Sequence, residues 1–187
     1  MKAITISRQM GSLGRKVGEE TARRLGYRMV WREVINEAAL RTGVPEMALA
    51  TIDELGLLGL KPSAANQEAY LRAVRQVIHE LVQVENVVIV GRAGQMILRE
   101  EKGVIHVRVV APLAVRIERT ASDMKLEPAA AKKLVEQSDR ARAQYLKRYY
   151  HASIDDPGLY DIVINTGRLA VEQAAGIVCA ALEMLPE

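Results

Sequence analysis

A short apolar run, a glycine-containing stretch and a helical pattern open the chain, and this order constrains the fold more than any other feature. Residues 2–6 (KAITI) are typical of a β-strand, residues 7–14 (SRQMGSLG) of a loop, and residues 15–25 of a helix that ends at Gly26. A glycine loop leading from a strand into a helix presents unpaired amides to an anion. The pattern therefore predicts an α/β fold with an anion site at the carboxyl end of the first strand.

The remaining chain continues to alternate strands and helices. We expect further strands at residues 27–31, 87–90, 104–110 and 160–165, and helices at residues 32–42, 45–57, 67–84, 93–101, 113–124, 128–150 and 169–185. Residues 56–65 break the pattern as a loop, and Asn66 is expected to cap the helix after it. Five short strands alternating with helices predict an open parallel sheet covered on both faces, within a single domain spanning residues 1–187.

Composition excludes several classes of protein. The single cysteine, Cys179, cannot form an internal disulfide, and histidines at 79, 106 and 151 do not form a zinc site. No apolar run approaches the roughly 18 to 20 residues of a membrane-spanning helix, and the first apolar run is too short for a signal peptide. We therefore expect a cytoplasmic protein with no membrane partner.

Basic residues concentrate in the second half of the chain. Between Arg108 and Tyr150 there are ten basic and five acidic residues. Because guanidinium groups match phosphate geometry, this concentration favours a compact polyanion site, although ordinary solvated helix faces explain part of it equally well. The only features that favour a nucleic-acid-binding module are the net charge of +3 and this basic helix, so we expect no nucleic-acid partner.

The glycine loop is a degenerate match to the phosphate loop G-x-x-x-x-G-K-S/T. With Gly14 as the second glycine, Gln9 replaces the first glycine, Arg15 the lysine and Lys16 the hydroxyl residue. The alternative is a tight turn whose glycines only permit positive φ. If the loop binds a nucleotide, either Arg15 or Lys16 supplies the cation. The candidate phosphate-binding positions are Ser7, Gly11, Ser12, Leu13, Gly14, Arg15, Lys16 and Val17, with Ser12 as the candidate magnesium ligand.

Several separated segments resemble one family. They are ITISRQMGSLGRKVGEETARRLGY near the N-terminus, VVIVGRAGQMIL at 87–98, IHVRVVAPLAVRIER at 105–119, SDRARAQYLKRYY at 138–150 and DDPGLYDIVINTGRLA at 155–170. In order and spacing they resemble the cytidylate-kinase-like proteins, a branch of the nucleoside monophosphate kinases with a variant phosphate loop. The resemblance implies a three-layer P-loop kinase fold with a five-stranded parallel sheet. It also implies a helical insert over the acceptor nucleotide, at about 32–84, and a short lid at about 116–150.

The resemblance also implies an acceptor site. Gly91 and Arg92 resemble a Gly-Arg-Asp element that lines this site in the relatives, but the third residue here is Ala93, which leaves the nucleobase open. Asp139 and Arg142 stand at the spacing of an Asp-x-x-Arg pair that holds the monophosphate. Since residues three apart share a helix face, the two side chains can either enter one cleft or form a surface ion pair. Arg148 completes the expected substrate-binding set.

Two further groups of residues are assigned by the same resemblance. Arg116 and Arg119 resemble lid arginines that close on the transferring phosphoryl group, the alternative being packing and pairing with Glu118 or Asp123. Asn165, Thr166 and Arg168 follow the last strand, where relatives place the adenine of ATP.

The expected activity is ATP-dependent phosphoryl transfer to a nucleoside monophosphate, with CMP or a related pyrimidine nucleotide as the leading acceptor and Mg²⁺ as the metal. The alternatives are a non-catalytic nucleotide-binding or regulatory protein on the same fold, motivated by the degenerate loop, and a kinase of another small phosphate acceptor. The sequence leaves open whether the protein is a monomer or a homodimer.

Overall fold

A five-stranded parallel sheet forms the centre of the computed structural model, which describes residues 1–43 and 64–185. The strands are β1 (Ala3–Arg8), β2 (Arg28–Val30), β3 (Val87–Val90), β4 (Val104–Val110) and β5 (Ile162–Asn165). Their order in the sheet is β2-β3-β1-β4-β5, and every pairing is parallel. The expected parallel α/β sheet is thus confirmed, with β1 at its centre.

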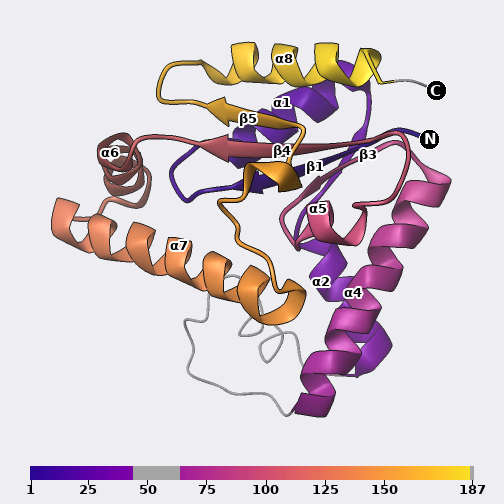
Figure 1. The fold of residues 1–187 in the computed structure, drawn as a ribbon. Helices are drawn as coiled ribbons and strands as arrows, with labels where there is room; N and C mark the ends of the chain where they lie inside the picture. The colour runs from indigo at the N-terminus through magenta and orange to yellow at the C-terminus, as the bar shows by residue number, and fades with distance from the viewer. Residues whose placement is uncertain (44–63, 186–187) are drawn as a thin grey trace.

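Helices cover both faces of the sheet (Figure 1). The helical elements are α1 (Gly14–Leu25), α2 (Glu33–Thr42), α4 (Ala64–Val84), α5 (Gly94–Ile97), α6 (Leu113–Met124), α7 (Pro128–Tyr150), the 3₁₀ turn η1 (Pro157–Leu159) and α8 (Val171–Glu183). Helices α1 and α8 lie together on one face, and α2, α4, α5 and α7 lie on the other. Strands β4 and β5 point toward α6, so the carboxyl edge of the sheet lies beside α6 and α7.

Alternation along the strands divides the core into two apolar layers. On β1, Ile4 and Ile6 pack with Val17 of α1 and Val178 of α8. Ala3, on the opposite face, belongs to a second cluster that includes residues of α2, α4 and α7. Because both faces are covered, the central strands are buried along their whole length, as parallel sheets require.

The structure corrects some element boundaries. Helix α4 begins at Ala64, so Asn66 lies inside its first turn and not at its cap. The helix expected at 93–101 ends at Ile97, because the chain then turns toward β4 with Glu101 N donating to Leu98 O. Asp156 accepts a hydrogen bond from Gly158 N and starts η1. The expected helix at 45–57 and most of the loop at 56–65 lie outside the described residues.

Within the described ranges 1–43 and 64–185, no helix combines the length and apolarity needed to cross a bilayer.

A buried polar pair crosses from β1 to β4 near the middle of the sheet. His106 Nδ1 lies 2.8 Å from Thr5 Oγ1, and the backbone amide of His106 donates to Asp161 Oδ2. Burial of the imidazole lowers the pKa of His106 below its usual range, and the carboxylate of Asp161 only partly offsets this effect. His106 is therefore neutral in the folded protein at neutral pH.

Acidification is expected to destabilise the fold through His106. Below about pH 6.5 the unfolded chain binds a proton that the folded state resists, so the free energy of unfolding falls by up to about 1.4 kcal/mol per pH unit until the folded-state pKa is reached. Urea unfolding between pH 5 and 8 measures this slope. His106→Gln should flatten it, whereas the exposed His151→Asn should leave it unchanged. Equal slopes in both variants would contradict the assignment.

Candidate functional site

The loop between β1 and α1 is built to leave helix amides accessible to an anion. Gly11 has φ +75° and Leu13 has φ +59°, so the chain reverses twice before α1 begins at Gly14. The side chain of Leu13 does not cap the helix, and its first turn carries no acidic residue. The amides of the first turn and the positive end of the helix dipole therefore suit a bound phosphate.

Both glycines of this loop are required by close approach as well as by backbone freedom. A Cβ on Gly11 would lie 2.5 Å from the backbone oxygen of Arg116, and a Cβ on Gly14 would lie 2.5 Å from Arg8 Cβ. The loop therefore lies directly against the backbone of α6 at Gly11 and against the end of β1 at Gly14. Neither position can hold a larger residue without moving the loop.

Gly11→Ala is expected to destabilise the protein by about 2–4 kcal/mol and to disable the loop, because the new methyl group meets rigid backbone. Gly26→Ala is the matched control, since Gly26 also has positive φ (+67°) but a Cβ added there would meet no atom within 4 Å. The control should lose only about 1 kcal/mol. Chemical denaturation of both variants makes the comparison, and equal losses would show that the contact with α6 is unimportant.

Hydrogen bonds of three polar side chains hold the loop in place. Ser12 is fully buried, and its Oγ donates to Gln9 O at 2.8 Å. Thr166, after β5, donates to Ser12 O at 2.7 Å, and Gln9 Oε1 accepts from Ala111 N at 3.1 Å. The hydroxyl groups of Ser12 and Thr166 thus donate their hydrogen bonds to carbonyls of the loop. Coordination of magnesium by Ser12 would require its hydroxyl to leave Gln9.

Arg116 and Arg119 of α6 also reach into this framework. Arg116 is buried and donates to Ala111 O, to Met10 O and, at 2.8 Å, to Asp139 Oδ2. Arg119 donates to Gly11 O at 3.4 Å and to Thr166 O at 2.9 Å. Among the described residues, the partners of these arginines are therefore backbone carbonyls, Thr166 and Asp139, and not the neighbouring acids Glu118 and Asp123. In this arrangement both arginines brace the loop.

Arg15, the residue at the lysine position, extends along the surface of α1. Its side chain is half exposed, lies 3.5 Å from Glu19 Oε1, and stacks 5.2 Å from the ring centroid of Trp31. Arg32 stacks on the same ring at 4.7 Å. Lys16 is exposed, whereas Val17 is part of the core. Trp31, the only tryptophan of the chain, therefore lies against two guanidinium groups at the edge of the site.

Three consecutive residues with positive φ directly follow strand β3: Gly91 (+86°), Arg92 (+56°) and Ala93 (+52°). Left-handed backbone costs roughly 1–2 kcal/mol for each residue that carries a Cβ, so this turn is strained. It buries Arg92 to 4% exposure at the carboxyl edge of the sheet. The sequence motif Gly91-Arg92 therefore forms part of a left-handed turn directly after β3.

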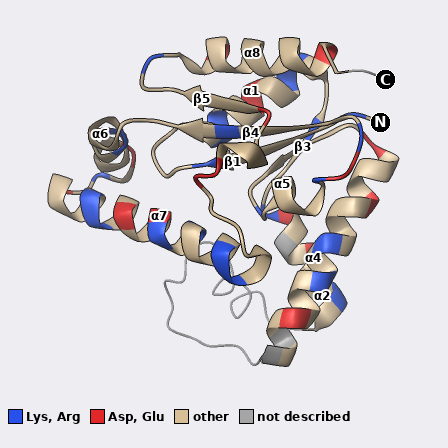
Figure 2. Ribbon diagram, in the orientation of Figure 1, with Lys and Arg blue, Asp and Glu red and all other residues tan. Residues whose placement is uncertain are grey.

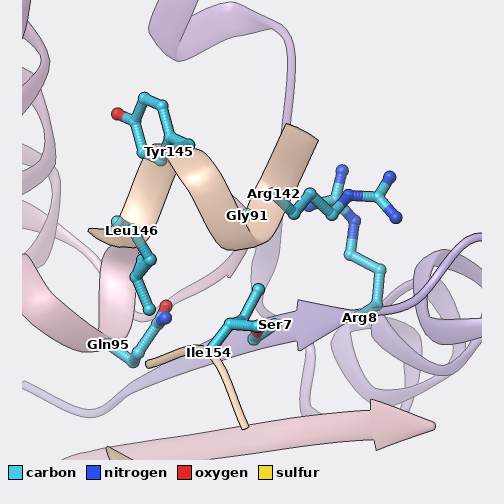
Figure 3. Close-up of a pocket in the computed structure, with 9 residues that line it drawn as sticks. Ser7, Arg8, Gly91, Gln95, Arg142, Tyr145, Leu146 and Ile154 are labelled. Carbon is cyan, nitrogen blue, oxygen red and sulfur yellow. The ribbon is translucent and has the colours of Figure 1, made fainter. Parts of the chain in front are cut away.

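An arginine-lined cleft opens at this edge, between the phosphate loop and α7. One hollow is lined by Ser7, Arg8, Gly91, Ala93, Gln95, Arg142, Tyr145, Leu146 and Ile154 (Figure 3). The adjoining hollow, of about 260 Å³, is lined by Arg8, Gln9, Arg108, Asp139, Arg140, Arg142, Ala143, Ile154 and Asp155. Basic positions also recur along α7 (Figure 2). The cleft thus places several guanidinium groups beside the loop.

Mutual repulsion makes this cleft strongly attractive to anions. Burial, together with the charges of Arg8, Arg142 and Arg32, lowers the pKa of Arg92 to about 9, against an opposing contribution from Tyr145. Two carboxylates line the cleft, but Asp139 is bound to Arg116, and Asp155 lies 3.5 Å from Arg108. A phosphate dianion would relieve this repulsion.

The expected site residues divide into those that line the cleft and those that do not. Arg142 and Asp139 line it together, although the carboxylate of Asp139 is bound by Arg116 at 2.8 Å. Arg148 lies elsewhere, with its guanidinium 3.3 Å from Gln67 Oε1. Asn165 and Arg168 are exposed beside the loop.

Arg8 and Arg108 line the cleft but were not among the site residues expected from the sequence. Arg108 Nη1 donates to Ser7 Oγ at 2.9 Å, because these residues are direct partners in the β1–β4 register. A signal existed for both arginines. Arg8 directly precedes the loop, and Arg108 interrupts a mostly apolar strand in its carboxyl half. A charged residue at that end of a buried strand faces the ligand edge of an α/β sheet.

The parallel sheet, the glycine loop at its carboxyl edge and the helices on both faces define a P-loop kinase fold. Solved structures with this arrangement include an uncharacterized protein from Eubacterium ventriosum, with a TM-score of 0.79 and 19% identity, which covers 98% of this chain and 99% of that one. Shikimate kinase from Bacteroides thetaiotaomicron has a TM-score of 0.58 and 15% identity, with the same coverage of both chains.

The chain belongs to the cytidylate kinase-like family, whose model matches residues 3–168. A cytidylate kinase from Methanocaldococcus jannaschii is 35% identical over 109 residues, which are 57% of this chain and 61% of that protein. A uronate isomerase from Corynebacterium glutamicum is 25% identical over 147 residues, which are 79% of this chain. This chain spans only 28% of the length of the latter protein.

Proposed function

We propose that the chain is a single-domain phosphotransferase that moves the γ-phosphoryl group of ATP to a nucleoside monophosphate, with CMP or a related pyrimidine nucleotide as the leading acceptor. The observation that carries this proposal is the arginine-lined cleft beside the phosphate loop. A donor triphosphate on the amides at Gly14 would lie beside the cleft that Arg8 and Arg142 line. An acceptor phosphate in that cleft would lie near Arg92, whose neighbours Gly91 and Ala93 line it. Phosphoryl transfer requires this juxtaposition together with charge neutralisation.

The chain's residues have distinct parts in this proposal. The first turn of α1 binds the donor phosphates, and Asn165, Thr166 and Arg168 border the adenine of ATP. Arg92 and Arg142 hold the acceptor phosphate, while Arg116 and Arg119 keep the loop in position for in-line transfer. The insert at 32–84 and the lid at 116–150 remain the proposed segments that enclose the acceptor.

Magnesium is the metal that this chemistry implies, and the residues present fit it only in part. Among the described residues, no group of three or more His, Cys, Asp or Glu side chains could hold a metal ion. Mg²⁺ commonly binds through substrate phosphates with one or two carboxylates, and Asp155 is an exposed carboxylate that lines the cleft. Ser12, the other candidate, is already committed to Gln9. The metal would shield phosphate charge when bound.

Turnover with ATP, Mg²⁺ and a panel of nucleoside monophosphates tests the proposal directly. We expect diphosphate formation with a pyrimidine acceptor, and Trp31 fluorescence should change on ATP binding because Arg15 and Arg32 stack on the ring. No turnover across the full panel would overturn the activity. Activity only with another phosphorylated or hydroxylated small molecule would retain the fold-based phosphotransferase and replace the acceptor.

A non-catalytic nucleotide-binding protein is the second candidate. The contacts of Arg15 with Glu19 and Trp31 and of Ser12 with Gln9 favour it, because the residue at the lysine position and the candidate magnesium ligand both make other contacts. ATP binding measured by calorimetry without any turnover would support this candidate over the kinase.

A further inference from the structure

The cation that the phosphate loop needs has no evident source on α1. Arg15 pairs with Glu19 and stacks on Trp31, and Lys16 is exposed. In a standard phosphate loop the lysine that follows the second glycine turns back to reach the terminal phosphates. Here Arg15, which directly follows Gly14, extends along the helix surface, so a second positive charge beside the loop is to be sought on another element.

Arg8 brings a guanidinium group to the loop from the end of β1. It is the last residue of that strand, it is only 9% exposed, and its stem passes so close to Gly14 that a Cβ there would lie 2.5 Å from Arg8 Cβ. Gly14 therefore has to be glycine partly because Arg8 runs beside the first turn of α1. The Arg8 side chain therefore leaves the strand alongside the first turn of α1.

The far end of Arg8 lies between the two halves of the cleft. Arg8, Arg142 and Ile154 line both hollows. Figure 3 shows the side chains of Arg8 and Arg142 extending toward each other on one side of the pocket. The charge of Arg8 also contributes to the lowered pKa of Arg92, which is consistent with the two guanidinium groups lying near each other.

We propose that Arg8 replaces the phosphate-loop lysine and binds the phosphoryl group in transit, between donor phosphates on α1 and an acceptor phosphate at Arg92 and Arg142. This inference rests on the proposed phosphotransferase function. An acceptor phosphate oxygen forms a bond to the γ-phosphorus as the bond from that phosphorus to the β–γ bridging oxygen breaks, giving two nucleoside diphosphates. Arg8 neutralises charge on the equatorial oxygens of the phosphoryl group.

The decreases in kcat of two glutamine variants, compared with each other, test this assignment. Arg8→Gln is expected to lower kcat at least about a hundredfold. This decrease should be at least about tenfold larger than the decrease in kcat of Arg15→Gln. Arg99→Gln, which changes an exposed arginine next to Glu100, is the control for loss of one positive charge. A kcat of Arg8→Gln within threefold of the parent protein, or a larger loss in Arg15→Gln, would overturn the proposal.

Chemical rescue separates a phosphate-binding role from a structural one. Guanidinium ions at millimolar concentration should restore part of the turnover of Arg8→Ala and none of the turnover of Arg15→Ala, with melting temperature monitored for each. If Arg8→Ala does not fold, Arg8→Lys is used in its place. Lysine keeps the positive charge but lacks the planar guanidinium group that binds two phosphate oxygens at once, so kcat should fall at least tenfold while the melting temperature is preserved. Parental kcat in Arg8→Lys, or absence of rescue in a folded Arg8→Ala, would contradict the proposal.

A binding measurement keeps the inference testable even if the proposed function fails. If the parent protein turns over no acceptor, calorimetry with inorganic tripolyphosphate on the folded variants still reports the cation beside the loop. Arg8→Gln should bind tripolyphosphate at least tenfold more weakly than Arg15→Gln. Equal affinities in the two variants would reject Arg8 as the loop cation, whereas absent turnover in the parent protein rejects only the kinase activity.

Discussion

Arg92→Met is expected to stabilise the unliganded protein by about 1–4 kcal/mol and to lower turnover more than a hundredfold. Burial and the neighbouring charges of Arg8, Arg142 and Arg32 lower the pKa of Arg92 to about 9, so the folded state disfavours its charge. Replacing a buried charge by an apolar side chain of similar length removes that cost, and the left-handed backbone at residue 92 is unaffected. The same change removes a guanidinium group from the proposed acceptor site.

Urea unfolding and steady-state kinetics measured on one preparation make this test. Arg99→Met is the matched control, because Arg99 is exposed and lies outside the cleft, and its stability should change by less than about 0.5 kcal/mol. A loss of stability above about 1 kcal/mol in Arg92→Met would mean that the Arg92 guanidinium is held mainly by favourable contacts. Full retention of turnover would remove Arg92 from the acceptor site.

Much of the fold follows from the sequence because local patterns determine it. The β-branched run Val87–Val90 between polar residues predicts a buried strand, and Gly91 after it predicts the turn that the structure contains. The boundaries of α5 and α4 were less predictable. The residues that end α5 fit a helical pattern, and they leave it because the chain must turn into β4.

The candidate site was only partly predictable, because its contacts depend on how distant elements pack. The spacing of Asp139 and Arg142 predicts that they share one helix face, and both residues line the same cleft in the structure. It cannot show that Asp139 contacts Arg116, which lies 23 residues earlier on α6, since the angle between α6 and α7 is not encoded in either helix alone. Arg108 and Ser7 meet only through the β1–β4 register.

Arg116→Met is expected to lower the free energy of unfolding by about 2–3 kcal/mol, which distinguishes a loop brace from a mobile lid arginine. The guanidinium of Arg116 satisfies two backbone carbonyls and the carboxylate of Asp139, and its side chain is only 6% exposed. Its removal leaves these acceptors without their donor, at a cost reduced because Asp139 is about one-third exposed. A lid arginine that contacts only the reacting phosphates would change kcat and leave stability intact.

A double-mutant cycle with Asp139→Asn isolates the pair, and an exposed pair of similar geometry calibrates it. Arg72 and Glu68 approach to 2.9 Å on α4 with both side chains about two-thirds exposed, so their coupling should be below about 0.5 kcal/mol. The coupling of Arg116 with Asp139 should exceed about 1 kcal/mol, since this pair is shielded by the loop and α6. Arg116→Met should also raise KM for ATP, because it removes the donor to the carbonyl of Met10, and Asp139→Asn should raise KM less, because Arg116 remains. If the coupling matches that of the exposed pair while kcat alone falls, Arg116 acts on the phosphoryl group and the loop does not depend on it.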